Sequence, residues 1–295
     1  KWSKTLFGTA LKAKGYQSLK ETYATTDLNL NINRLLFKNI SASASFQYRS
    51  QPLNFNYHLF QSDFKEYNWS NTNLVNQNTS TKSIGVSHPK WGNVSAAWST
   101  INNYGFFVNR TPLNFLNKKF KVEMLQLDKQ IDYFKARFNQ RLDFGKLSWI
   151  NNVQYQKVTQ EQDLDQILGD PLTLNVPEWL IRSTLMMTSS IFNKALSFQS
   201  GATFVFFTDY YADQYNPLLS EFVTQNNTKI GEYPRVDFFF NAKIKSSRIF
   251  IKLENVSATI EHLINVDTPY DYYAAPFTPY RDFSIRFGLI WNFFQ

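Results

Sequence analysis

One C-terminal segment groups side chains of the types that could catalyse a reaction. The set consists of Ser257, Glu261, His262, Asp267, Asp271 and Asp282. A serine, a histidine and a carboxylate can act together in acyl transfer, but only in a defined geometry that closeness in sequence does not provide. We therefore predict that the protein is not an enzyme.

Residues that could bind a metal are also sparse. Asp163, Asp165 and Asp170 in EQDLDQILGDP suggest a calcium loop, but they lack the ligand spacing and the glutamate of an EF-hand. The absence of cysteine and the presence of only three histidines leave little for a zinc site. His88 alternates with Val86 beside a turn and is interpreted as an interface residue. We expect no metal and no cofactor.

The composition excludes several classes of protein. Of 295 residues, 28 are Phe, 16 Tyr and 7 Trp, a richness in aromatic residues that argues against disorder. The mean hydropathy of -0.37, and the lack of an uncharged apolar run of about 18 residues, exclude a bundle of transmembrane helices. A transmembrane barrel stays open, because its apolar face occupies alternate residues. The net charge of +8 is dispersed, so we expect no nucleic-acid partner.

Alternation is clearest in the last fifteen residues, RDFSIRFGLIWNFFQ. Apolar side chains occupy every second position there, and the intervening positions are largely polar, which predicts a strand with two unlike faces. The segment resembles the C-terminal assembly signal of bacterial outer-membrane barrels, with Phe287, Trp291 and Phe293 as its residues. The final Gln295 departs from the common aromatic last residue.

Tight turns recur about every fifty residues. They are centred near Asn39, Gly92, Gly145, Lys194 and Ser247. Long segments between them, such as 67–81, 161–177, 210–234 and 257–280, are too long for loops of a compact soluble domain. Short turns at one end and long loops at the other are typical of an outer-membrane barrel. We predict an all-β, transmembrane, antiparallel up-and-down β-barrel with about twelve strands.

The domain organisation follows from the same pattern. We expect residues 1–295 to form a single barrel domain. Because the chain begins abruptly at what we interpret as a turn, we expect it to be the C-terminal part of a longer precursor, whose barrel could be larger.

A family resemblance is carried by about sixty C-terminal residues. The segment YPRVDFFFNAKIKSSRIFIKLENVSA, followed by PYDYYAAPFTPYRDFSIRFGLIWNFF, resembles the end of the putative porin family of Bacteroidetes. The resemblance implies a barrel in the bacterial outer membrane with an uncharacterised substrate. It implies no catalytic residue.

The alternation also predicts which charged residues face the barrel lumen, since a charge facing mid-membrane lipid costs about 2–4 kcal/mol. The predicted basic lumen residues are Arg49, Lys135, Arg137, Arg141, Arg182, Lys243, Lys252 and Arg286. A basic wall favours anions. The alternative is that these charges pair with carboxylates such as Asp237 and Glu254 and only fill the barrel.

Aromatic residues near the tight turns predict a girdle at the periplasmic interface. They are Trp2, Phe37, Trp91, Phe144 and Phe192. Basic residues at the same turns would contact anionic lipid head groups.

The function that follows is a porin-like outer-membrane channel for passive diffusion of small solutes, with a possible preference for anions. The alternative is a plugged structural or interaction barrel in a secretion or nutrient-uptake complex. The barrel of an energised receptor would need an upstream plug domain. Expected partners are outer-membrane lipids, the barrel-assembly machinery during biogenesis, and other outer-membrane proteins or surface lipoproteins.

Overall fold

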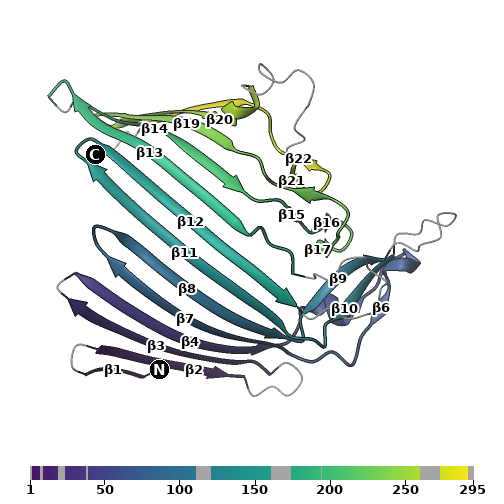
Figure 1. Ribbon diagram of the computed structural model, residues 1–295. Helices are drawn as coiled ribbons and strands as arrows, with labels where there is room; N and C mark the ends of the chain where they lie inside the picture. Colours follow the sequence, from purple (N-terminus) through teal and green to yellow (C-terminus); the bar gives the residue numbers. More distant parts are fainter. Residues whose placement is uncertain are drawn as a thin grey trace.

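One antiparallel sheet of thirteen strands dominates the protein (Figure 1). The computed structural model describes residues 2–6, 9–18, 24–37, 39–110, 121–160, 174–193, 195–259 and 273–291. Each long strand pairs with the next long strand along the chain, so the sheet runs up and down in sequence order. In that order its strands are β1 (Trp2–Leu6), β2 (Thr9–Gln17), β3 (Thr26–Phe37), β4 (Ile40–Gln51), β7 (Gln77–His88), β8 (Gly92–Asn102), β11 (Ile131–Phe144), β12 (Leu147–Gln160), β13 (Trp179–Ile191), β14 (Leu196–Phe207), β19 (Arg235–Ile244), β20 (Ser247–Glu254) and β23 (Ser284–Trp291).

All five tight turns expected from the sequence are present. They join β3 to β4, β7 to β8, β11 to β12, β13 to β14 and β19 to β20, and they lie at one end of the sheet (Figure 1). Gly92 begins β8 with φ of +90°, and a Cβ there would collide with the backbone carbonyl of Asn139 on β11. This turn therefore requires glycine both for its dihedral angle and for the close approach of a neighbouring strand.

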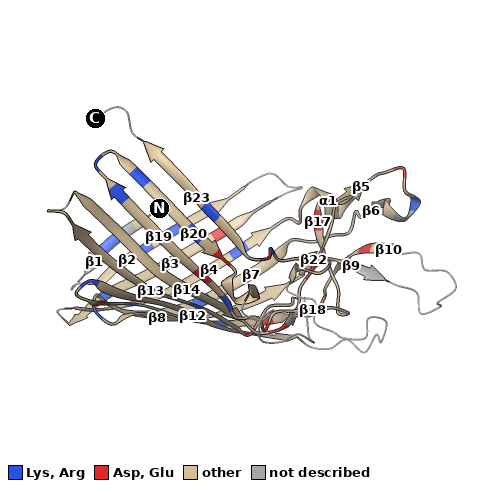
Figure 2. Cartoon of the chain, turned by 90° about the horizontal axis from the view of Figure 1, so that it is seen from above, with Lys and Arg blue, Asp and Glu red and all other residues tan. Residues whose placement is uncertain are grey.

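The sheet has one strand more than the twelve expected. The additional strand is β1, which pairs with β2 from Leu6 opposite Thr9 to Trp2 opposite Ala13. The basic N-terminal residues that we interpreted as a turn are therefore part of a strand. Within the described residues, β1 and β23 each have a neighbour on one side only. The described strands form an open, curved wall, with the middle strands β8, β12 and β14 at its base (Figure 2).

The long loops fold into a structure of their own at the other end of the sheet. We call this the loop module, made of residues 52–76, 104–110, 121–126 and 208–234. Its strands are β5 (Leu59–Phe60), β6 (Trp69–Ser70), β9 (Gly105–Arg110), β10 (Lys121–Gln126), β15 (Tyr210–Tyr211), β16 (Gln214–Asn216), β17 (Glu221–Thr224) and β18 (Lys229–Ile230), with helices α1 (Phe55–His58) and η2 (Lys65–Tyr67). The last loop adds the hairpin of β21 (Tyr273–Ala275) and β22 (Thr278–Pro279).

The buried apolar cluster lies in the loop module and not in the large sheet. Phe107, Val122, Leu219 and Val223 are nearly inaccessible to solvent, and aromatic rings from residues 57–69 pack around them. The rings of Tyr57 and Phe107 stack with centroids 4.6 Å apart. In the described part of the chain, no helix is long and apolar enough to cross a membrane.

Candidate functional site

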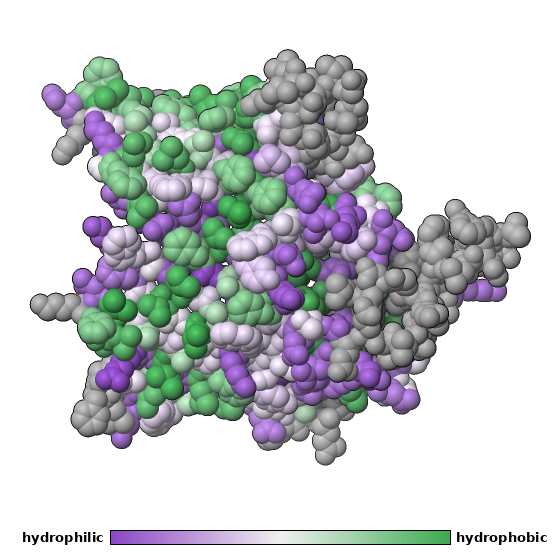
Figure 3. Space-filling model, in the orientation of Figure 1, coloured by the Kyte–Doolittle hydropathy of each residue, from purple (hydrophilic) through white to green (hydrophobic). Residues whose placement is uncertain are grey.

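The two faces of the large sheet differ in chemistry, as the alternation predicted. On β3, Leu28, Leu30 and Ile32 are exposed, whereas the intervening Asn29 and Asn31 are half-buried. Apolar side chains gather in the same way over many of the strands on the convex face (Figure 3). Water would not stabilise such a surface, but lipid does. The convex face is therefore the lipid-facing side, and the polar concave face is the candidate site.

The pairing register shows which residues share the concave face, because directly opposed residues of paired strands point to the same side. Arg137 lies opposite Ser95 on β8 and Gln154 on β12. Arg182 on β13 lies opposite Asn152, which itself lies opposite Asn139. Continued across the sheet, the register places all eight predicted basic residues on this one polar face, including Arg49, Lys243, Lys252 and Arg286.

Four of these eight cations are paired with carboxylates. Arg49 contacts Asp27 at 3.1 Å, and Arg141 contacts Asp143 at 3.0 Å. Lys252 and Arg286 both contact Glu254, at 2.7 and 2.9 Å. For this half of the set, the alternative interpretation of mutual neutralisation describes the geometry well.

The other four cations have no carboxylate partner among the described residues. Arg137 donates a hydrogen bond from Nε to the neutral amide of Gln154 at 2.7 Å. The Nζ of Lys135 lies 5.7 Å from the centre of the Tyr133 ring. No carboxylate lies within ion-pair distance of Arg182 or Lys243 in the described structure. These four cations contribute unpaired positive charge to the wall.

Two hollows in the wall are lined by pairs of basic residues. Arg137 and Arg182 line the first, of about 320 Å³, together with the amides of Asn139, Asn152 and Gln154. The second, of about 410 Å³, is lined by Lys243, Arg248, Ser197, Gln199 and Asn241 among others. Neither lining contains a carboxylate. Each hollow thus offers cations and hydrogen-bond donors suited to an anion.

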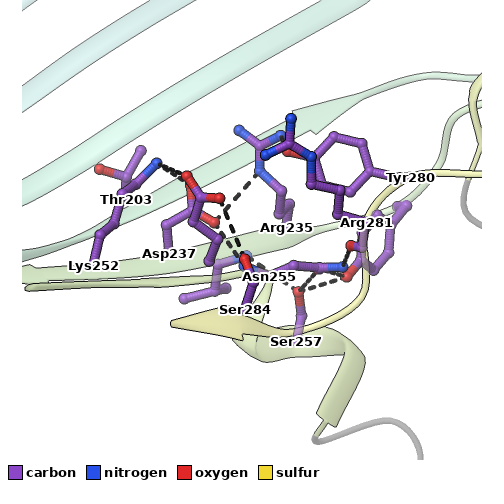
Figure 4. A network of polar contacts seen from close by, with 12 residues as sticks. Thr203, Arg235, Asp237, Lys252, Asn255, Ser257, Tyr280, Arg281 and Ser284 are labelled. Atoms are coloured by element: carbon purple, nitrogen blue, oxygen red, sulfur yellow. Dashed lines mark hydrogen bonds and ion pairs between the residues drawn. The ribbon is translucent and has the colours of Figure 1, made fainter. Parts of the chain in front are cut away.

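A polar network closes the loop end of the wall, on β19, β20 and β23 (Figure 4). The buried carboxylate of Asp237 lies 3.6 Å from Arg235 and 3.7 Å from Lys252, and it accepts a hydrogen bond from the Asn255 backbone. Lys252 continues the network to Glu254. With Arg286, three cations meet two carboxylates, so the network keeps one positive charge in excess.

The same network fixes the last loop against the wall. The guanidinium of Arg235 lies 5.0 Å from the ring centre of Tyr280 and donates to its hydroxyl at 2.5 Å. Asn255 donates to the carbonyl of Arg281 at 2.8 Å. A cavity of about 190 Å³ opens beside these contacts, lined by Val205, Phe207, Gly231, Tyr233, Arg235, Tyr273, Ala274 and Tyr280. Arg235 and Tyr280 were not among the residues predicted from the sequence, although both lie within the segments that carry the family resemblance.

The weak catalytic candidates do not form a described site. Ser257 is buried, and its hydroxyl is hydrogen-bonded to Tyr233 at 2.8 Å and to Asn255 at 3.2 Å. Asp282 lies in the described segment beside β23. Outside the described residues lie Glu261, His262, Asp267 and Asp271, and also Asp163, Asp165 and Asp170. Among the residues that the structure does describe, no acidic or histidine cluster could hold a metal ion.

His88 stabilises a turn. Its Nδ1 accepts hydrogen bonds from the backbone N–H groups of Lys90 and Trp91, both at 3.1 Å. Its ring faces that of Trp91 at 6.4 Å. This contact fixes the turn between β7 and β8, so the histidine has a local structural role.

Four of the five residues predicted to form an aromatic girdle lie in or beside the tight turns. Phe37, Trp91, Phe144 and Phe192 are 61–76% exposed and lie in or beside the turns. Trp2 lies at the end of β1 away from its turn with β2.

The C-terminal signal residues can be placed only in part. Phe287 and Trp291 lie on the outward face of β23, with exposed fractions of 82% and 57%. Phe293 lies outside the described residues.

Solved structures with a similar fold are outer-membrane receptors. The ferric enterobactin receptor PfeA of Pseudomonas aeruginosa matches with a TM-score of 0.58 and 13% identity, over 86% of this chain and 38% of the receptor. The FrpB iron transporter of Neisseria meningitidis matches with a TM-score of 0.55 and 12% identity, over 87% of this chain and 40% of the transporter. The chain thus spans less than half of either protein, and at this identity the likeness concerns the fold alone.

Sequence comparison identifies the family. None of the curated proteins compared with the chain matches it. A family model described as "Putative porin" matches residues 1–295, the whole chain. The two-faced sheet and its likeness to outer-membrane receptor barrels agree with that match. The protein therefore belongs to the putative porin family and lies in the bacterial outer membrane.

Proposed function

We propose that the protein forms the wall of an outer-membrane channel through which small solutes diffuse passively, with a preference for anions. The observation that carries the proposal is the hollow shared by Arg137 and Arg182, which contains two cations, three amide side chains and no carboxylate. Together with the second basic hollow, it supports a path in which anions are attracted without being held by a tight, enclosed site. The proposal assigns no catalytic residue and no cofactor.

Ion selectivity in planar bilayers tests this proposal. We expect steady ohmic conductance from the purified protein, and a reversal potential in a salt gradient that favours anions. Replacing Arg182 with Gln removes one of the two cations from the first hollow. A unit charge about 7 Å from the ion path in water attracts an anion and repels a cation by roughly 0.6 kcal/mol each, so the anion-to-cation permeability ratio should fall about sevenfold.

The matched control removes the same charge from the opposite face. Lys4 lies opposite Leu11 on the outward side of β1, so Lys4→Gln should leave the permeability ratio unchanged. Correctly folded protein that conducts no ions would overturn the channel proposal. Conductance with equal permeability for anions and cations would retain the channel and reject the anion preference.

A second candidate is an interaction barrel whose loops bind another outer-membrane protein or a surface lipoprotein. The folded loop module favours it, because Phe55, Phe64 and Phe222 are each about 60% exposed on an otherwise well-packed structure. Exposed aromatic residues on a rigid support are frequent anchors of protein interfaces. Absence of conductance, combined with a partner that co-purifies and is lost in Phe222→Ser, would favour this second function.

A further inference from the structure

One row of side chains on the lipid-facing side combines aromatic rings with two lysines. The pairing register makes Phe46, Lys82, Trp98, Phe134 and Lys157 direct neighbours on β4, β7, β8, β11 and β12. We call them the aromatic–lysine row. The rings of Trp98 and Phe134 lie 5.3 Å apart between the two lysines. The row is thus an aromatic surface with a lysine on each side.

The neighbouring rows show where the aromatic–lysine row lies relative to the membrane. One step towards the long loops, the outward positions on the same five strands are Tyr48, Ser80, Thr100, Asp132 and Thr159. One step towards the tight turns they are Ala44, Ile84, Ala96, Ala136 and Tyr155. The outward face therefore changes from apolar to polar at this row, which marks the boundary between hydrocarbon and head groups.

Both lysines are free to bind an external anion. Lys82 and Lys157 are exposed, and neither forms an ion pair with any carboxylate in the described structure. Asp132 in the adjacent row accepts a hydrogen bond from Gln130 at 2.8 Å. Two unpaired ammonium groups on a lipid-facing surface need a negative partner that reaches them from the membrane.

We propose that the aromatic–lysine row binds the head group of a phosphorylated glycolipid of the outer leaflet. Its sugar rings would lie against Trp98 and Phe134, and its phosphates would contact Lys82 and Lys157. These lysines are three strands apart, or about 14 Å between Cα atoms, a separation that suits a head group with two phosphates. The long loops define the outer side of the membrane, so the row belongs to the outer leaflet.

Lipid binding by the folded full chain tests the proposal. The probes are nanodiscs of phosphatidylcholine that contain diphosphoryl lipid A or its dephosphorylated form, with retained glycolipid measured by mass spectrometry after the disc is exchanged for neutral detergent. The diphosphoryl form should be retained and the dephosphorylated form lost. Replacing Lys82 and Lys157 together with Gln should weaken binding about thirtyfold, because each lysine near a charged head group contributes roughly a fivefold factor.

Lys135→Gln is the matched control. Lys135 adjoins Phe134 in sequence but points to the concave face, so the loss of its charge should leave glycolipid retention unchanged. Replacing both Lys82 and Lys157 with Arg should preserve binding, which separates loss of charge from damage to the fold if the Gln variant folds poorly. Equal retention of the two glycolipids by the wild-type protein would overturn the proposal. So would full competition by inorganic phosphate, which would indicate a site for a free anion.

Discussion

At the scale of single residues, Asp213 in the loop module is an unusual carboxyl group. Its Oδ1 is enclosed and accepts no hydrogen bond within the described structure. Burial raises its pKa from 3.8 to about 6, and a hydrogen bond from Thr224 opposes this rise only in part. The hydroxyls of Tyr57 and Tyr104 nearby have pKa values raised to about 12, chiefly by burial, so they stay neutral.

The raised pKa predicts that the loop module becomes more stable as the pH falls from 7 to 4. The folded module binds a proton between about pH 6 and 4 that the unfolded chain does not bind, so protonation stabilises the folded form by up to about 3 kcal/mol. Hydrogen exchange of the β16 and β17 amides, corrected for intrinsic rates, should show greater protection at pH 5 than at pH 7. Asp213→Asn should remove the dependence; an unchanged dependence would assign it to another group.

A second residue-scale prediction concerns Gly92. Gly92→Ala should lower the free energy of unfolding by more than about 2 kcal/mol, because the new methyl group would collide with the β11 backbone at Asn139. Gly145→Ala is the control, since φ is also positive there, at +64°, but a Cβ would meet no atom within 4 Å. Urea titration, with the folded fraction read from gel migration, measures the unfolding midpoint of both variants. Equal midpoints would show that the contact between the β8 turn and β11 is unimportant.

At the scale of elements, the last strand tests the assignment of faces. Phe287 points outward and is 82% exposed, whereas Arg286 points to the concave face and contacts Glu254, which keeps Lys252 as a second partner. Phe287→Arg places a charge towards lipid and should cost about 2–4 kcal/mol near mid-membrane. Arg286→Ser should cost well under half of that. Assembly in the outer membrane, measured by heat-modifiable migration, compares the two variants. Equal damage would mean that the faces are wrongly assigned.

The strands of the wall could be predicted from the sequence, because the alternation of apolar and polar side chains along a strand is a pattern of neighbouring residues. Val236, Phe238 and Phe240 stand at every second position, with the polar Asp237 among the residues between them, and β19 spans that segment. The five-residue β1 was missed because so short a strand carries little periodic signal. The loop module was missed for another reason: Phe107 and Val223 pack together across 116 positions, and no local pattern encodes that contact.

The candidate site was predictable to a similar degree. Alternation along the strands predicts that Arg137 and Arg182 point to one face of the sheet, and in the pairing register the two residues share the concave face. Alternation alone does not reveal that Arg137 and Arg182 line one hollow. Nor does it reveal that carboxylates neutralise Arg49 and Arg141. Such differences depend on side-chain contacts between strands and on the contour of the folded wall. The contact of Arg235 on β19 with Tyr280 in the last loop likewise could be found only from the structure.

At the scale of the whole molecule, we expect that the loop module can unfold while the wall stays folded. Phe107→Ala removes the largest side chain of the module core and should destabilise the module by about 3–5 kcal/mol. The wall has its own lipid-supported pairing, so heat-modifiable migration should persist. Limited proteolysis of intact cells should then cleave the loops of the variant and spare those of the wild type. Loss of both properties together would show that wall and module fold as one unit.

The parallel pairing of β9 with β17 also has a consequence for biogenesis. Val223 lies opposite Phe107, and four strands of the wall, β11, β12, β13 and β14, lie between the two residues in sequence. Contacts between such distant segments close late, because the intervening chain must first be ordered. The surface formed by β9 and β17 therefore exists only after those strands have been inserted. An antibody that recognises this surface would label finished molecules on living cells and ignore stalled assembly intermediates.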